Sequence, residues 1–285
     1  MLVLLAFSLV PAGLLAERRY EAKGVVLRVD RQRHTMEVSC REIPGFMDAM
    51  AMSFPVADAK VLDSLARGAF VEFTLVVGND ASRAENVRIR SYDSAEREPA
   101  QARRLQALDE ALRGPVRRLA VGQAVPDFTL IDQQGRTLHF GQFSGKVVAL
   151  NFVYTRCALP EYCFRSSNNF GILQRQFEKR LGKELVLLTV TFDPVHDRPE
   201  NLREYAKTWK ADPAHWHFLT GEAAEVQRVC DLFGVNYVPD EGLFVHSLHS
   251  VIVGRDGRLV ANLEGNEFTA QQFADLLKTV LDPAQ

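Results

Sequence analysis

The chain has 285 residues, of which 47% are hydrophobic, and its formal net charge at pH 7 is −2. This near-neutral balance offers no basic face, so the composition excludes nucleic acid as a partner. The length predicts one or two domains. Four cysteines are too few for a disulfide scaffold, and we expect local chemistry from them. They are Cys40, Cys157, Cys163 and Cys230.

Residues 1–16 form an apolar start that ends at the charged pair Glu17 and Arg18. The run of about 15 apolar residues is shorter than the roughly 20 that a membrane-spanning helix needs. Small residues precede the boundary, which makes Ala16 a candidate last residue of a secretory signal peptide, although a basic leading segment is missing. A cleaved signal, an uncleaved anchor and a buried helix remain open. The first two predict a protein that is periplasmic or membrane-anchored and facing the periplasm.

Residues 17–92 have the pattern of a small all-β domain. Its strand-like runs are residues 23–40 with a turn inside, 52–57, 69–77 and 84–92. Period-two alternation in these runs is typical of strands with one buried face. Five such strands predict an OB-like β-barrel, with a short helical turn at 58–68.

Residues 93–120 differ in composition and are rich in Ala, Arg, Glu and Gln. Leu105, Leu108 and Leu112 recur at helical spacing, and Gly114 followed by Pro115 would end a helix. The segment therefore predicts a partly helical linker with a solvated, charged surface.

Residues 121–285 alternate between strand-like and helical runs. Two strand patterns, 147–153 and 185–192, are almost continuously apolar, as strands covered on both faces must be. Helical runs follow at 164–181, 199–210, 222–234 and 268–281. The second domain is therefore predicted to be an α/β layer fold.

Cys157 and Cys163 lie just after the first of these apolar strands, with five residues between them. Ligands gather at the carboxyl ends of strands in such sheets, and a following helix N-terminus lowers a thiol pKa. Six residues span about 9 Å in a helix and about 20 Å in a strand, so cooperating thiols require a loop between them. Pro160 favours that loop. The pair could form a disulfide, bind a soft metal such as Cu(I), or be two inert buried thiols.

Three of the five methionines lie within six residues, at Met47, Met50 and Met52. On a strand, Met50 and Met52 point the same way, and thioether sulfurs at that spacing suit Cu(I). Phe54 and Val56 continue the same phase, so the two methionines could equally extend a core stripe. Spacing alone leaves both interpretations open.

Residues from about 121 to 281 resemble the Sco/SenC family of copper-handling proteins, which have a thioredoxin-like fold. The resemblance rests on the cysteine pair, on "DPVHDRPE" at 193–200 and on "HSLHSVIVGRDG" at 246–257. It implies Cu(I) or Cu(II) held by Cys157, Cys163 and one imidazole. When the family motif is aligned at Gly257, its histidine and the Ser or Thr after it fall on His246 and Ser247. The alignment therefore favours His246 over His249 as the ligand. In this family the cysteine spacing is usually three residues and a proline commonly follows the second cysteine, whereas Phe164 stands there in this chain.

Other polar residues of this domain have weaker claims to the site. Side chains alternate between the two sides of an extended segment, so His246 and His249, three residues apart, should lie on opposite sides. Only one of them should therefore reach the cysteines. Asp193 could orient a metal ligand without binding the metal itself. Asp197 fits the N-cap position of the helix that begins at Pro199. We expect Cys230 in the core, and solvated or structural roles for His196, His215 and His217.

Residues from about 20 to 90 resemble the CusF-like periplasmic copper-binding domain, a small OB-type barrel. The family binds metal through a histidine and the methionines of an "MxM" strand, with a tryptophan over the metal. Here "MAM" supplies Met50 and Met52, Cys40 holds the histidine position, and Met47 holds the tryptophan position. The resemblance implies a Cys40, Met50 and Met52 copper site, with Met47 as a further ligand or a lid.

Together these patterns predict a two-domain periplasmic copper metallochaperone. The barrel would take up Cu(I), and the second domain would carry copper to a recipient, which the Sco/SenC resemblance implies is the copper centre of a cytochrome c oxidase subunit. A thiol-disulfide oxidoreductase acting through Cys157 and Cys163, with His246 as the base, is the alternative. A copper-storing detoxification module, based on the barrel alone, is a third.

Overall fold

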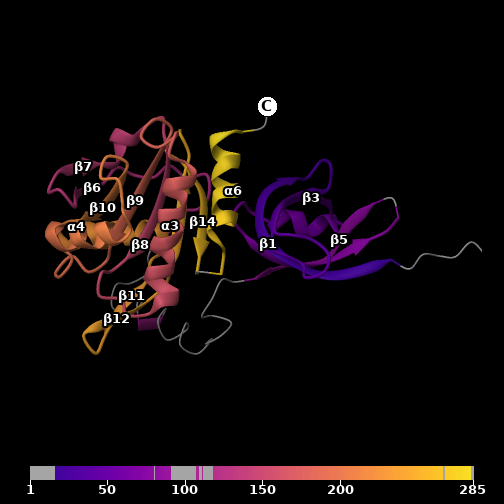
Figure 1. Cartoon of the computed structure of the whole chain (residues 1–285), viewed down its shortest axis with the longest axis horizontal. Helices are drawn as coiled ribbons and strands as arrows, with labels where there is room; N and C mark the ends of the chain where they lie inside the picture. The colour runs from indigo at the N-terminus through magenta and orange to yellow at the C-terminus, as the bar shows by residue number, and fades with distance from the viewer. Residues whose placement is uncertain are drawn as a thin grey trace, which may run out of the picture.

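The computed structural model describes residues 17–79, 81–90, 107–108, 111, 118–265 and 267–283, and these fold into two domains (Figure 1). The predicted signal or anchor at 1–16 and most of the predicted linker lie outside the described residues. Within the described part of the chain, no helix has both the length and the apolar character needed to cross a membrane.

The first domain is a five-stranded antiparallel sheet in the order β3-β2-β1-β4-β5. Its elements are β1 (Arg18–Asp30), β2 (Thr35–Cys40), β3 (Ala51–Pro55), the 3-10 helix η1 (Ala59–Asp63), β4 (Phe70–Val77) and β5 (Ser82–Arg90). A parallel bridge between Val56 and Ala84 brings the end of β3 to β5 and closes the sheet into a barrel. The predicted all-β fold and its helical turn are confirmed.

One crossing inside the barrel requires a glycine. Gly24 pairs with Cys40 across β1 and β2. A Cβ atom at position 24 would lie 2.2 Å from the Ser39 carbonyl oxygen and 2.9 Å from the Cys40 Cα atom. Only a residue without a side chain allows the two strands to approach this closely next to Cys40.

The second domain is built on a seven-stranded mixed sheet in the order β14-β13-β8-β9-β10-β6-β7. Its strands are β6 (Thr129–Asp132), β7 (Thr137–His139), β8 (Val147–Val153), β9 (Leu185–Thr191), β10 (Trp216–Thr220), β13 (His249–Val253) and β14 (Leu259–Glu264). The central strands β8, β9 and β10 are parallel, and every residue of β8 and β9 is buried. Their apolar runs thus correspond to a sheet covered on both faces.

Helices cover the two faces of this sheet. They are η2 (Phe140–Phe143), η3 (Pro160–Phe164), α3 (Arg165–Gln176), α4 (Pro199–Thr208), α5 (Ala223–Phe233) and α6 (Ala270–Leu281). Apolar side chains of α3, α4 and α6 pack with Val147 and Ala149 on one face, whereas those of α5 pack with Val148 and Leu150 on the other. The α/β layer prediction is confirmed.

A hairpin that the sequence patterns did not predict projects from this domain. It consists of β11 (Tyr237–Asp240) and β12 (Leu243–His246), joined by a two-residue turn. Glu241 and Gly242 both have positive φ angles, 46° and 83°, as a tight hairpin turn requires. The strands have four residues each, which are half-buried or exposed, so they carry no clear alternation.

The two domains share a continuous apolar core. Val25, Leu27 and Phe70 of the barrel are buried in the same cluster as Ala261 and Leu263 of β14 and the inner face of α6. In Figure 1, α6 accordingly lies between the barrel and the rest of the second domain. The domains are therefore packed against each other at this helix.

Candidate metal centre

The two cysteines and one histidine of the second domain converge at one edge of its sheet. Cys157 follows β8, Cys163 lies in η3, and His246 ends β12. One ligand atom from each lies within 4.8 Å of the others, and Cys163 Sγ is 3.7 Å from His246 Nε2. This is the edge at which parallel strands end, where ligands of such sheets bind.

The five residues between the cysteines form a loop that turns into a short helix. Just after β8, the Cys157 N–H donates a hydrogen bond to the Tyr154 carbonyl, at 3.3 Å, and this turns the chain. Pro160 then begins the π-helical turn η3, in which Tyr162 has non-helical angles, φ −103° and ψ −111°. This irregular turn brings Cys163 back to Cys157, as the spacing argument required, before α3 starts at Arg165.

His246 has the tautomer that a metal ligand needs. Its Nδ1 atom lies 2.9 Å from the Ser247 carbonyl oxygen. A carbonyl only accepts hydrogen bonds, so Nδ1 carries a proton, and in the neutral ring Nε2 therefore presents its lone pair toward the cysteines. The rings of Tyr154 and Phe192 pack around the imidazole, with centroids 5.6 and 4.8 Å away.

His249 points elsewhere. It begins β13, is 3% exposed, and its Nδ1 lies 2.9 Å from the Asn262 side-chain oxygen. Burial lowers the pKa of His249 and keeps the ring neutral. The structure therefore brings only one of the two histidines to the cysteines, as the period-two argument predicted.

The two thiols differ in protonation. A hydrogen bond from Cys163 is the main cause that lowers the pKa of Cys157 to about 4, and His246 also contributes. Burial raises the pKa of Cys163 well above its usual value. At neutral pH the pair is one thiolate and one thiol, both free of disulfide. The sequence predicted a lowered pKa from a helix N-terminus, but the partner thiol is the larger cause.

Selective alkylation should reveal this asymmetry. We expect iodoacetamide to modify Cys157 ahead of the buried Cys40, Cys163 and Cys230, at a rate nearly constant from pH 6 to pH 8, because its pKa of about 4 leaves it ionised throughout. Mass spectrometry would locate the adduct. Cys163→Ala removes the hydrogen-bond donor and should make the rate rise with pH, whereas Cys163→Ser keeps a donor and should not. Equal pH profiles for these two variants would contradict the assignment.

Arg156 holds three segments of the site together. Its guanidinium donates to Asp193 Oδ2 at 2.7 Å and to the Gly242 carbonyl at 3.0 Å. His196 Nδ1 lies 2.9 Å from the other Asp193 oxygen. Asp193 is therefore placed beside the residue that precedes Cys157, and through Arg156 it links the cysteine loop to the hairpin that carries His246.

Asp197 is not the N-cap that the sequence predicted. Arg198 occupies the N-cap position of α4, and Asp197 is fully buried. Its carboxylate accepts hydrogen bonds from the Thr155 N–H at 3.0 Å and from the hydroxyls of Thr155 and Thr191. The side chain turns inward because these donors, at the ends of β8 and β9, satisfy it better than a helix terminus on the surface would.

The remaining candidates have structural positions. Cys230 is fully buried among apolar side chains on α5, as predicted. His217 is buried beside Asp132, and His215 packs next to Gly182. Sequence reasoning did not identify Arg156 or Thr155, because neither shows a pattern. Their position within two residues of Cys157 in the chain was the only available signal.

The barrel places its sulfur residues on one face. In the β2–β3 register, Val38 pairs with Met52 and Met36 with Phe54, and the Cys40 N–H donates to the Met50 carbonyl at 2.9 Å. Residues paired across a ladder share a face, so Cys40, Met50 and Met52 all belong to the inward-facing stripe. Phe54 is fully buried, Met52 is half-buried and Met50 is 49% exposed. The stripe thus changes from core to accessible thioether toward one end of the barrel.

Cys40 is the most buried of the three sulfur residues. It is 1% exposed and packs in the barrel core, and burial raises its pKa to about 12. Met47 is half-buried against the same core, in the loop between β2 and β3. A metal at Cys40 would have to displace the thiol proton, whereas the two thioethers need no deprotonation.

Each of the two domains matches a known protein family. Residues 118–282 match the SCO1/SenC family model, and residues 19–89 match that of the copper-binding periplasmic protein CusF. A SCO1 protein homolog of Bacillus subtilis is 24% identical over 160 residues, 55% of this chain and 80% of its own. A SCO2-like protein of Rickettsia prowazekii is 27% identical over 161 residues, 53% and 74%.

Solved structures share the fold of the second domain. Arabidopsis thaliana ScoI with copper bound aligns over 57% of this chain and 100% of its own, with a TM-score of 0.50 and 21% identity. A SCO1/SenC family lipoprotein of Bacillus anthracis gives the same TM-score and coverage at 22% identity. The SCO1/SenC match spans more than half of the 285 residues, so this copper-binding chain belongs to the SCO1/SenC family.

Proposed function

We propose that this protein is a copper metallochaperone that takes up Cu(I) on the barrel and carries copper on Cys157, Cys163 and His246 to a recipient. The convergence of the three donors within 4.8 Å carries the proposal. Two thiolates and an imidazole are donors that copper prefers. One thiolate is already formed, and the imidazole Nε2 faces the thiols, so little reorganisation is needed to bind the ion.

The surroundings of the cluster support handover to another protein. Four of the exposed large apolar side chains lie in the segments that form or flank the site, namely Leu159, Phe164, Val195 and Leu243. An apolar rim around an accessible thiolate favours docking of a partner that brings its own soft ligands. Phe164 replaces the proline common in the family, so this rim differs from that of its relatives.

We propose a copper site of cytochrome c oxidase as the recipient and a location outside the cytoplasm. BsSco is described as a member of the Sco family of cytochrome c oxidase assembly proteins. CusF is a periplasmic protein, and the Bacillus anthracis relative is a lipoprotein. Both point to an extracytoplasmic setting, where a metal carrier meets its recipient.

A thiol-disulfide oxidoreductase is the second candidate, and the low pKa of Cys157 favours it. The Cys157 thiolate would attack a partner disulfide, forming a mixed disulfide and releasing one partner thiolate. Cys163 would then attack the Cys157 sulfur, leaving a Cys157–Cys163 disulfide and a reduced partner. The two functions use the same atoms, because the oxidised pair cannot bind copper. Storage on the barrel alone leaves the cluster without a role.

Copper stoichiometry tests the chaperone function. The reduced protein, prepared without oxygen, should bind about two Cu(I) ions per chain. Cys157→Ser/Cys163→Ser and Met50→Leu/Met52→Leu should each lose one of them, because each removes the donors of one site. Cys230→Ala, which changes a core cysteine that is not among the proposed ligands, should retain two.

Full stoichiometry in both double variants would rule out the two proposed sites. Loss of copper only with Met50→Leu/Met52→Leu, combined with a mixed disulfide trapped by Cys163→Ser, would favour the oxidoreductase instead.

A further inference from the structure

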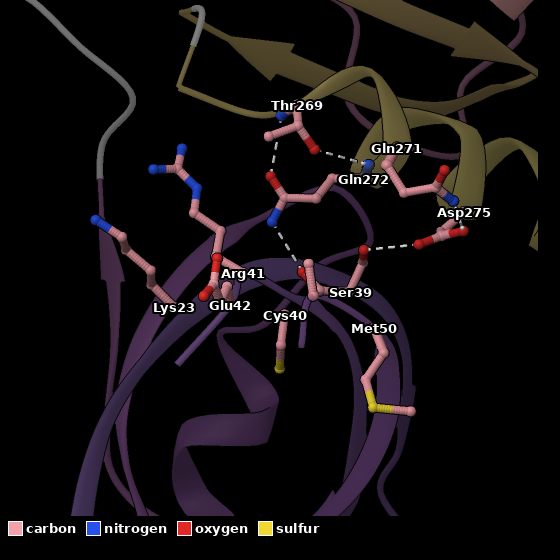
Figure 2. A pocket seen from close by; sticks show the side chains of 11 residues that line it. Lys23, Ser39, Cys40, Arg41, Glu42, Met50, Thr269, Gln271, Gln272 and Asp275 are labelled. Carbon is pink, nitrogen blue, oxygen red and sulfur yellow. Dashed lines mark hydrogen bonds between the residues drawn. The ribbon is translucent and has the colours of Figure 1, made fainter. Parts of the chain in front are cut away.

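The sulfur-bearing end of the barrel opens onto a cavity between the two domains. This cavity has a volume of about 320 Å³. Figure 2 shows Cys40 and Met50 on its barrel side and Gln271, Gln272 and Asp275 of α6 on the other side. A helix of the second domain therefore forms one wall of the space next to the residues that carry the barrel sulfurs.

Ser39, the residue before Cys40, is held by two side chains of α6. Gln272 Nε2 donates to the Ser39 carbonyl at 2.9 Å, and the Ser39 hydroxyl donates to Asp275 Oδ2 at 2.8 Å. Figure 2 draws both bonds between the domains. Ser39 is 2% exposed, so water does not replace these partners if they are lost.

Arg41, the residue after Cys40, is also held across the interface. Its guanidinium donates to the Glu267 carbonyl and lies 3.5 Å from the Glu267 carboxylate. Its backbone N–H donates to the Lys23 carbonyl at 2.9 Å. Both neighbours of Cys40 are therefore held by contacts to the second domain, in addition to the hydrogen bonds within the barrel.

These bonds control the direction of the Cys40 side chain. Neighbouring residues on a strand point to opposite faces, so Ser39 faces α6 while Cys40 faces the barrel interior. Anchoring the Ser39 backbone and hydroxyl limits rotation of β2 about its axis, and that rotation would swing the thiol away from Met50. A metal site gains affinity when its ligands are held in place before binding.

We propose that Gln272 and Asp275 are positioning residues of the barrel copper site, so that the affinity of the barrel for copper depends on the second domain. The inference rests on the proposed role of Cys40, Met50 and Met52 as copper ligands. Apolar contacts at Val25, Leu27 and Phe70 already join the domains. The hydrogen bonds to Ser39 also fix the orientation of the end of β2, which carries the Cys40 thiol.

The full chain with Cys157→Ser/Cys163→Ser isolates the barrel site for measurement. In this parent, Gln272→Glu keeps the oxygen that accepts the Thr269 N–H, and so the helix cap, but loses the donor to Ser39. Asp275→Ala loses the acceptor for the Ser39 hydroxyl, whereas Asp275→Asn keeps one. Lys278→Ala, on the same helix, removes a side-chain contact to Asp275 Oδ1 and leaves both bonds to Ser39, so it is the matched control.

Competition with a chromophoric Cu(I) chelator would give the dissociation constant of each variant. We expect Gln272→Glu and Asp275→Ala to weaken copper binding by about 5- to 30-fold, the effect of losing one buried hydrogen bond. Asp275→Asn and Lys278→Ala should bind like the parent, and the melting temperatures should separate this effect from general loss of fold.

Two outcomes would overturn the inference, and they are distinguishable. Equal affinity in the parent, Gln272→Glu and Asp275→Ala would overturn it alone. Absence of copper from the parent would overturn the barrel copper site itself, and the inference with it.

Discussion

Replacement of His246 by alanine is expected to weaken copper binding at the second-domain site by about 100-fold or more, because one of its three donors is lost. The Nε2 atom lies 3.7 Å from Cys163 Sγ and is the ring nitrogen left to bind a metal, since Nδ1 donates to the Ser247 carbonyl. Without it, the two thiolates alone would bind Cu(I) and would hold Cu(II) poorly. The measurement is chelator competition for Cu(I), made on the Met50→Leu/Met52→Leu background so that the barrel does not contribute.

His249→Ala is the control for this prediction. Its ring is 3% exposed and bonds Asn262, so its removal should cost about 2 kcal/mol of unfolding free energy by leaving a cavity. Copper affinity should stay within a factor of about three of the starting protein, because the ring does not face the thiols. If His249→Ala lost affinity and His246→Ala kept it, the assignment of the ligand would be wrong.

Replacement of Asp197 by alanine is expected to lower the free energy of unfolding by about 3 kcal/mol. The change leaves three donors without this acceptor, namely the partly buried N–H and hydroxyl of Thr155 and the buried hydroxyl of Thr191. Burial raises the pKa of Asp197, so the fold disfavours its ionised form, and these donors offset that cost. Urea unfolding followed by circular dichroism at pH 7 would measure the difference.

Asp197→Asn separates acceptor loss from cavity formation. It keeps the size of the side chain and one oxygen, so its loss should be smaller than that of Asp197→Ala. Because Thr155 lies two residues before Cys157, both variants should also weaken copper binding in the order of their lost stability. An alanine variant within about 0.5 kcal/mol of the starting protein would show that Asp197 does not anchor the cysteine loop.

Periodicity predicted the elements of both domains closely because their strands and helices bury regular faces. The apolar runs that became β8 and β9 are buried at every residue. The inward phase of Met52, Phe54 and Val56 also followed from alternation alone. The hairpin of β11 and β12 was not predicted because its short strands contain no fully buried residue and show no regular alternation, although it carries His246.

Residue type and spacing were enough to identify the soft donors and to require a loop between Cys157 and Cys163. They did not establish which groups would meet, because hydrogen bonds between segments far apart in the chain leave no periodic trace. Asp197 turning inward to Thr155, Arg156 joining Asp193 to the hairpin, and Gln272 reaching Ser39 across 233 residues are all such contacts. Each depends on the packing of the sheet and of α6, since only packing brings the donor and the acceptor within reach and excludes the water that would compete with them.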